Sequence, residues 1–189
     1  VKAYFDSDGV VEYYAKAAAE LGLWASEEKI LTRLFSPEDS LLELGCGAGR
    51  IAIGLYELGY RNLLATDYAR SMVAKGRDLA RVLEYHIPFR VCDATQLEFE
   101  EGIFDGVIFG FNGLMQIPQL EQRERALGEV FRVLRPGAWF VFTTHDRDRS
   151  EHRDFWAAET LRWEYGTEQA DLDDFGDRTE STHHGAHFM

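Results

Sequence analysis

The chain has little of several features that would place it in a specialised class of protein. It has two cysteines, Cys46 and Cys92, in 189 residues, which excludes a miniature held together by disulfides. Its first ten residues lack the basic start and apolar stretch of a signal peptide. The longest charge-free stretch, 106–120, is shorter than the ~20 apolar residues of a membrane span. We therefore expect a cytoplasmic chain that does not enter a membrane.

Positive charge is also scarce. The chain has 20 Lys and Arg against 33 Asp and Glu, a formal net charge of −13. A phosphate backbone would repel such a chain, and no cluster of Lys or Arg forms a basic patch that offsets the total. We therefore expect no nucleic-acid partner. Hydrophobic residues make up 46% of the chain, enough for the buried core of one domain.

What the sequence does have is an alternation of short apolar runs with amphipathic stretches. Apolar residues at helical spacing predict two leading helices, with Asp8 and Ser26 as their N-caps. Five apolar runs predict strands at 40–44, 63–66, 89–92, 106–111 and 138–144. Helices are predicted at 50–58, 71–85 and 120–134, the last with Leu127, Val130, Phe131 and Leu134 on one side, and a turn at 135–137. This order is typical of a Rossmann-like, doubly wound α/β fold, whose ligands lie at the carboxyl ends of parallel strands.

The strongest motif follows the first strand, where Glu43-Leu44-Gly45-Cys46-Gly47-Ala48-Gly49 opens the next helix. Glycines let the backbone turn sharply and let a ligand approach the main chain. The dinucleotide fingerprint G-x-G-x-x-G is not matched, because the third glycine comes one residue early and Arg50 takes its place. Glu43 would oppose a diphosphate but suits a ligand with positive charge. The loop therefore favours S-adenosylmethionine, with its sulfonium and ammonium groups, over NAD.

Asp67 ends the second strand, 22 residues after Gly45. A carboxylate at this position accepts hydrogen bonds from the hydroxyls of an adenosyl ribose, which does not distinguish S-adenosylmethionine from NAD. A helix-capping Asp is the alternative.

Taken together, these motifs resemble those of the class I S-adenosylmethionine-dependent methyltransferases of the small bacterial type. The resemblance covers residues 41 to about 145. The glycine loop resembles the first motif, and the later ones are Thr66-Asp67-Tyr68 with Met72, Cys92-Asp93-Ala94, the stretch 104–108 leading to Asn112, and Leu134-Arg135-Pro136-Gly137.

The resemblance implies S-adenosyl-L-methionine as cofactor, S-adenosyl-L-homocysteine as product, and a role for each matching residue. The cofactor-binding residues it implies are Glu43, Gly45, Cys46, Gly47 and Gly49 at the methionine end, Asp67 at the ribose, Tyr68, Met72, Asp93 and Ala94 at the adenine, and Asn112 at the reacting end.

The family also implies a division of one domain, 1–189, into three parts. We expect 1–36 to form N-terminal helices and a lid, although the aromatic residues there would equally serve as core packing. Residues 40–145 form the cofactor-binding core, with about five strands. Residues 146–189 form an acidic, aromatic excursion over the sheet, in which Trp156, Trp163 and Phe175 either line an acceptor pocket or only cover the sheet. We find no convincing candidates there for the C-terminal strands of the usual fold, which suggests a fragment.

Methyl transfer demands alignment more than a particular catalytic side chain, although a hydroxyl acceptor needs a base. His145 and Asp146, where the fifth strand ends, are the candidate bases, and a strand-end His bonded to backbone or water is the alternative. We expect no metal site, because His183, His184 and His187 fit exposed tail residues better. Arg50 is expected at the surface.

The sequence therefore predicts a methyltransferase that acts on nitrogen or oxygen of a small-molecule acceptor. The alternatives are a non-catalytic module that binds S-adenosylmethionine, an NAD(P)-dependent oxidoreductase and an aminopropyl transferase. The sequence does not indicate an oligomeric state.

Overall fold

The computed structural model describes residues 2–146, 149, 153–166, 175–177, 179–182 and 185–188. Its centre is a five-stranded sheet in the order β3-β2-β1-β4-β5, in which every neighbouring pair is parallel. The strands are β1 (Leu41–Glu43), β2 (Leu63–Asp67), β3 (Phe89–Val91), β4 (Phe104–Phe109) and β5 (Leu134–Phe142). The expected doubly wound α/β fold is confirmed. Its strand order reverses at β1, which lies between β2 on one side and β4 on the other.

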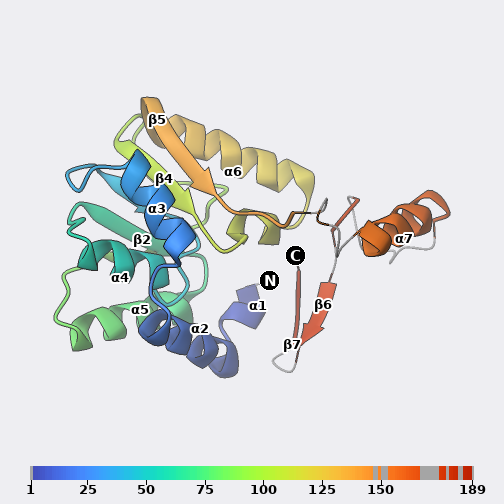
Figure 1. The fold of residues 1–189 in the computed structure, drawn as a ribbon, viewed down its shortest axis with the longest axis horizontal. Helices are drawn as coiled ribbons and strands as arrows, with labels where there is room; N and C mark the ends of the chain where they lie inside the picture. The colour runs from blue at the N-terminus through green and yellow to red at the C-terminus, as the bar shows by residue number, and fades with distance from the viewer. Residues whose placement is uncertain are drawn as a thin grey trace.

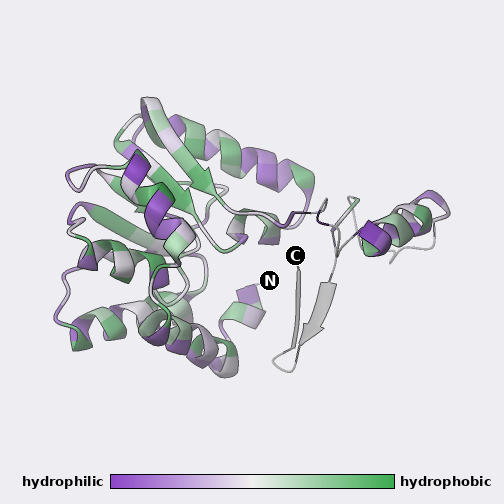
Figure 2. Ribbon diagram, in the orientation of Figure 1, coloured by the Kyte–Doolittle hydropathy of each residue, from purple (hydrophilic) through white to green (hydrophobic). Residues whose placement is uncertain are grey.

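Helices cover both faces of this sheet (Figure 1). The helical elements of the described residues are α1 (Lys2–Phe5), α2 (Asp8–Glu20), α3 (Ala25–Leu34), α4 (Arg50–Glu57), α5 (Arg70–Val82), the 3₁₀ turn η1 (Gly113–Gln116), α6 (Leu120–Val133) and α7 (Arg153–Glu164), of which α7 lies away from the sheet. Neighbouring residues of β1 separate the two faces: Leu41 packs into the cluster that holds α4 and α5 residues, and Leu42 into the cluster that holds α6 residues. Figure 2 shows the central strands as predominantly hydrophobic, as strands buried on both sides must be.

Several local expectations are corrected. The residue that precedes α2 is Ser7, so Asp8 lies inside the helix rather than capping it. Ser26 likewise lies inside α3, whose N-cap is Trp24; the backbone N–H of Trp24 donates to Glu27 Oε2 at 2.9 Å, which takes the place of the expected serine cap.

The expected turn at 135–137 is part of β5. The strand begins at Leu134, and its register against β4 shifts between Phe104 and Gly106. Gly137 has a φ of 83°, which absorbs the irregularity within the strand.

The apolar side expected for α6 is also wrong in part. The residues that α6 buries are Ala126, Val130 and Val133. Phe131 is 84% exposed and Leu127 is 41% exposed, because both project away from the sheet. Burial on this helix therefore follows small and β-branched residues rather than the largest apolar ones.

The C-terminal part differs from the core. Figure 1 shows α7 beside the sheet rather than across it, and the rings of Trp156 and Trp163 each lie near that of Phe175, at 6.2 and 6.0 Å between centroids. Two further strands, β6 (Thr179–Thr182) and β7 (Gly185–Phe188), pair antiparallel with each other in a separate sheet, and β7 contacts α1. The expectation for 146–189 falls partly outside the described residues, as do His183 and His184. In the described part of the chain, no helix is long and apolar enough to cross a bilayer.

Candidate functional site

The glycine loop joins β1 to α4 at the point where the strand order reverses. Gly45, Gly47 and Gly49 all have positive φ, at 60°, 54° and 93°. A Cβ atom on Gly45 would lie 2.7 Å from the ring of Phe109, and one on Gly49 would lie 2.7 Å from the ring of Phe89. Both positions therefore require glycine on two counts, backbone conformation and space.

Asp67 links this loop to the end of β2. Its Oδ2 accepts the N–H of Gly47 and its Oδ1 the N–H of Ala69, each at 2.8 Å. Burial raises the pKa of this carboxyl, against the pull of those N–H groups. The residue therefore holds two neighbouring loops together and does cap the turn before α5, so the capping role and a ligand-binding role are compatible.

Glu43 lies beneath the loop and is 2% exposed. Burial raises its pKa to about 8, although the charge of Arg50 and an N–H from Ala52 favour the ionised form. Its Oε2 has no hydrogen-bond partner among the described residues. A buried carboxyl oxygen without a partner is costly, and a cationic group brought near it would offset part of that cost.

Arg50 is mostly enclosed rather than at the surface, with 11% of its side chain exposed. Its guanidinium forms two hydrogen bonds of 2.6 Å to the carboxylate of Glu27 and one of 2.8 Å to the carbonyl of Gly22. The same group lies 4.9 Å from the ring centroid of Trp24. Arg50 therefore ties α4 to the start of α3.

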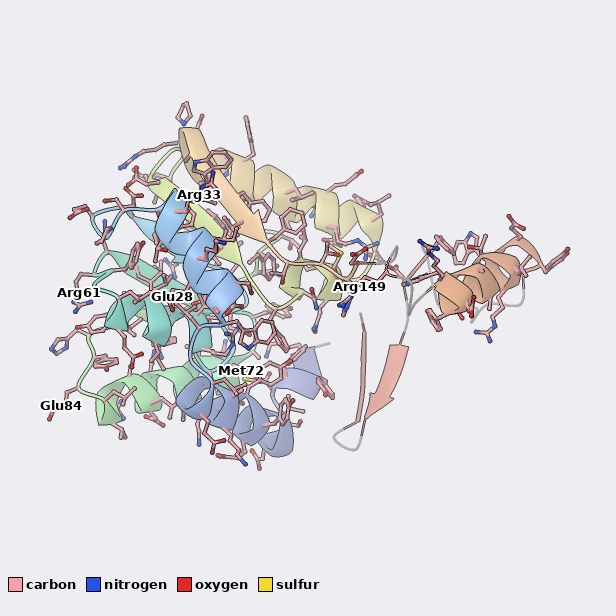
Figure 3. The ribbon with its side chains drawn as sticks, in the orientation of Figure 1. Glu28, Arg33, Arg61, Met72, Glu84 and Arg149 are labelled. Atoms are coloured by element: carbon pink, nitrogen blue, oxygen red, sulfur yellow. The ribbon has the colours of Figure 1, made fainter. Side chains whose placement is uncertain are left out.

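A cavity of about 330 Å³ opens above the glycine loop. Seven of the expected cofactor residues line it: Gly45, Gly47, Asp67, Tyr68, Met72, Asp93 and Ala94. Figure 3 marks Met72, which lies where α5 meets α2 and is 1% exposed. Of the described residues that line the cavity, none is Lys, Arg or His.

Four expected residues do not line this cavity: Glu43, Cys46, Gly49 and Asn112. Cys46 packs into the core on the α4 face, where burial raises the pKa of its thiol well above the usual value. The position requires a small residue, and the thiol is shielded from the cavity. Gly49 contributes the left-handed backbone conformation, with a φ of 93°, from which α4 begins.

Several lining residues were missed by sequence reasoning. They lie at the end of β4 and just after it, and include Phe109, Gly110, Phe111, Gly113, Gln116 and Ile117. The signal that would have found them is position, because the carboxyl ends of all the central strands meet at one edge of the sheet.

The N-terminal helices form one wall of the cavity. Phe5 and Tyr14 line it, with ring centroids 5.9 Å apart. Burial, together with Tyr4, Tyr13 and Asp67, raises the pKa of Tyr14 to about 12, so its hydroxyl is neutral. Asp6 Oδ1 accepts the N–H of Ser71 at 3.0 Å, which fastens this segment to the first turn of α5.

The loop after β4 holds two consecutive residues in the left-handed region, Phe111 at φ 49° and Asn112 at φ 59°. Such conformations are strained for a phenylalanine and concentrate at functional sites. The N–H of Asn112 donates to Thr143 Oγ1 at 2.7 Å, and its Nδ2 lies 3.2 Å from His145 Nε2. The ends of β4 and β5 thus bring Asn112 and His145 together, and Asp146 lies beside them in the chain.

In the described part of the chain, no group of three or more His, Cys, Asp or Glu residues is arranged to hold a metal ion.

Comparison with known proteins gives matches that include the residues of this site. A family model described as "Methyltransferase domain" matches residues 41–137, which contain the glycine loop, Asp67 and Asp93. A demethylmenaquinone methyltransferase of Leptospira interrogans is 34% identical over 111 residues, covering 57% of this chain and 43% of the relative. An eEF1A lysine and N-terminal methyltransferase of Mus musculus is 25% identical over 146 residues, covering 70% of this chain and 21% of the relative.

Among solved structures, an S-adenosylmethionine-dependent methyltransferase from Methanosarcina mazei aligns with a TM-score of 0.70 and 23% identity. The alignment covers 87% of this chain and 74% of that one. The chain spans less than half the length of these curated relatives.

Proposed function

Because the chain belongs to the methyltransferase domain family, whose class I members use S-adenosylmethionine, we propose that it binds this cofactor in the cavity above the glycine loop and transfers its methyl group. The observation that carries the proposal is the buried Glu43, whose Oε2 has no hydrogen-bond partner among the described residues. Glu43 lies under the glycine loop, where the missing side chains would let a ligand approach the main chain. The unpartnered carboxyl oxygen suits a ligand with a positive group.

The donor groups of the cofactor fit the acceptors that the cavity presents. Asp67 would hold the ribose hydroxyls, since each carboxylate oxygen can accept a second hydrogen bond beside its backbone N–H. Asp93 and Ala94 would contact the adenine, with Tyr68 and Met72 flanking it. Gly45 and Gly47 would contact the methionine end, and Cys46 and Gly49 would shape the loop. Glu43 lies below the loop, where a positive group on the ligand would favour its ionised form.

S-adenosylmethionine supplies an activated methyl group on a positive sulfur. The chain itself would align the acceptor with that group and exclude water from it, for which the apolar walls of Phe5, Phe109 and Phe111 are suited. His145 is our candidate for a base, because an imidazole can accept a proton and this one lies beside Asn112, where β4 and β5 end. Asp146 is the second candidate.

The acceptor we propose is a small molecule with a nucleophilic nitrogen or oxygen. The cavity lining includes Asp67 and Asp93 and, among the described residues, no basic side chain, so it suits a neutral or amine-bearing acceptor better than an acidic one. The two relatives named above carry different acceptors in their names, a quinone precursor and a protein lysine, so homology alone does not choose between them.

A non-catalytic module that binds S-adenosylmethionine is the second candidate. The observation that favours it is that Asn112 and His145 do not line the cavity. An NAD(P)-dependent oxidoreductase is disfavoured because no described Lys or Arg lines the cavity to meet a diphosphate.

Calorimetric titration with S-adenosylhomocysteine, and with NADH in parallel, tests the proposal. We expect the first to bind and the second not to bind. Binding of NADH alone would overturn the cofactor assignment. Release of S-adenosylhomocysteine during incubation of S-adenosylmethionine with a panel of amines and phenols then separates an enzyme from a binding module.

A further inference from the structure

Gln116 ends the 3₁₀ turn η1 and lines the cavity. Its side-chain Oε1 is buried and has no hydrogen-bond partner within the part of the chain that the structure describes. Buried polar atoms in folded proteins almost always have a hydrogen-bond partner, because burying a polar atom without one costs free energy. An acceptor atom of this kind in a ligand cavity points to an N–H or O–H donor on the ligand.

The position of Gln116 in the cavity narrows the choice of donor. Leu114 and Ile117, on either side of it, pack in the same hydrophobic cluster as Ala94 and Leu97. Gln116 therefore lines the same cavity as Asp93 and Ala94, the residues proposed to contact the adenine, although β3 and β4 are separated by two strands in the sheet.

The loop after β3 is held in this place by contacts of its own. Glu129 on α6 accepts the N–H of Leu97 at 2.7 Å, and Arg132 donates to the carbonyl of Leu97, also at 2.7 Å. Asp93 Oδ1 accepts both the N–H and the hydroxyl of Thr95, at 2.9 and 2.7 Å. This wall is therefore preorganised, with the Asp93 carboxylate fixed in orientation.

We propose that Gln116 Oε1 accepts a hydrogen bond from the exocyclic amino group of the adenine and so makes the site selective for a 6-amino base. This inference rests on the proposed function. An amino group has two N–H donors, and the lining of the cavity offers two separate acceptors, Asp93 and Gln116. A 6-oxo base would place an acceptor against these acceptors and leave them unpaired, which is how a buried polar site rejects a near-isostere.

The test compares S-adenosylhomocysteine with its 6-oxo analogue, S-inosyl-L-homocysteine, by calorimetric titration. The wild-type chain should bind the adenosyl form more tightly. Gln116→Met keeps the length of the side chain and removes the acceptor, so the affinity ratio should fall roughly tenfold. Gln116→Glu keeps an acceptor and should retain the preference.

Gln122→Met is the matched control. Gln122 also lines the cavity, but neither polar atom of its side chain is both buried and without a hydrogen-bond partner. It should leave the ratio unchanged. A ratio that does not move in Gln116→Met, or equal weakening of both ligands, would overturn the role of Gln116 while leaving the proposed function intact. Failure of the wild-type chain to bind either ligand would instead overturn the proposed function and the inference with it. Thermal unfolding of each variant checks that it is folded.

Discussion

The sheet has an enclosed half, around β1 and β2, and an open half, at the edge strand β5 and helix α6. Where β1 and β2 end, the backbone is enclosed: all three residues of β1 are buried, and the loop after it is packed against two aromatic rings. Where β5 ends, side chains are open to solvent, with Trp139 56% exposed and Phe142 44% exposed. The glycine loop of the proposed cofactor site is therefore packed against the core, whereas the candidate bases His145 and Asp146 lie on an exposed surface that can change without disturbing the core.

Substituting one glycine in each half gives the largest expected contrast. Gly49→Ala combines left-handed strain with a Cβ atom 2.7 Å from Phe89, and we expect it to lower the free energy of unfolding by about 4 kcal/mol. Gly137→Ala, with a φ of 83° and nothing within 4 Å of the added atom, should cost about 1 kcal/mol. Urea unfolding measures both. Equal losses would show that the enclosed half is no more tightly packed than the edge.

Glu43 should make the stability of the enclosed half depend on pH. Its raised pKa, about 8 against an ordinary value of 4.5, means that the folded chain holds a proton that the unfolded chain releases. Burial of Glu43 therefore does not lower the free energy of unfolding below about pH 4.5. That free energy falls as the pH rises from about 4.5 through 8, where the folded chain loses the proton.

Glu43→Gln keeps the shape and neutrality of the protonated side chain. Between pH 5 and 8 it should gain about 3 kcal/mol in unfolding free energy relative to the wild type. Glu20→Gln, at an exposed position, is the control and should follow the wild type. Parallel curves for the wild type and Glu43→Gln would mean that Glu43 is ionised in the folded chain at neutral pH.

Asp67→Ala should weaken the binding of S-adenosylhomocysteine by about 2 kcal/mol, the range for losing a charged hydrogen-bond partner. Asp78→Ala removes the same charge from the exposed side of α5 and should leave the affinity unchanged. Calorimetric titration measures both. An affinity that survives in Asp67→Ala would remove the ribose assignment and leave Asp67 as a cap for Gly47 and Ala69.

Much of the enclosed half could be predicted from the sequence. All five strands of the main sheet occur within a few residues of their predicted ranges. The central strands β1 and β4 were the plainest, because strands buried on both faces appear as unbroken apolar runs. The glycine loop was predictable because positive φ at alternate positions limits the choice of residue so strongly. Asp67 was expected because a carboxylate ends the second apolar run, and Asp93 because its motif resembles that of the family. Both line the cavity.

The errors fall where local pattern and tertiary context disagree. Ser26 has the residue type of a cap, but the helix begins one residue earlier and Glu27 bonds the first N–H. Gln116 carries no motif signal, since its significance comes from packing beside a loop that is distant in sequence. Arg50 was expected at the surface because the sequence does not show that Glu27 from α3 meets it. For Gln116 and Arg50, residues distant in the chain decide the outcome, whereas at Ser26 a local bond between Trp24 and Glu27 decides it.

The smallest expected effect concerns α6, at the open half of the sheet. Phe131→Ser should change the free energy of unfolding by less than about 0.5 kcal/mol, because the ring is 84% exposed and little apolar area is lost from the core. The adjacent Val130→Ala removes two methyl groups from a side chain that is 3% exposed and should cost about 1–2 kcal/mol. Urea unfolding of the two variants measures the contrast between the two faces of one helix. A loss in Phe131→Ser as large as that in Val130→Ala would show that the ring is packed in solution, and the open half of the sheet would then have to be described as covered.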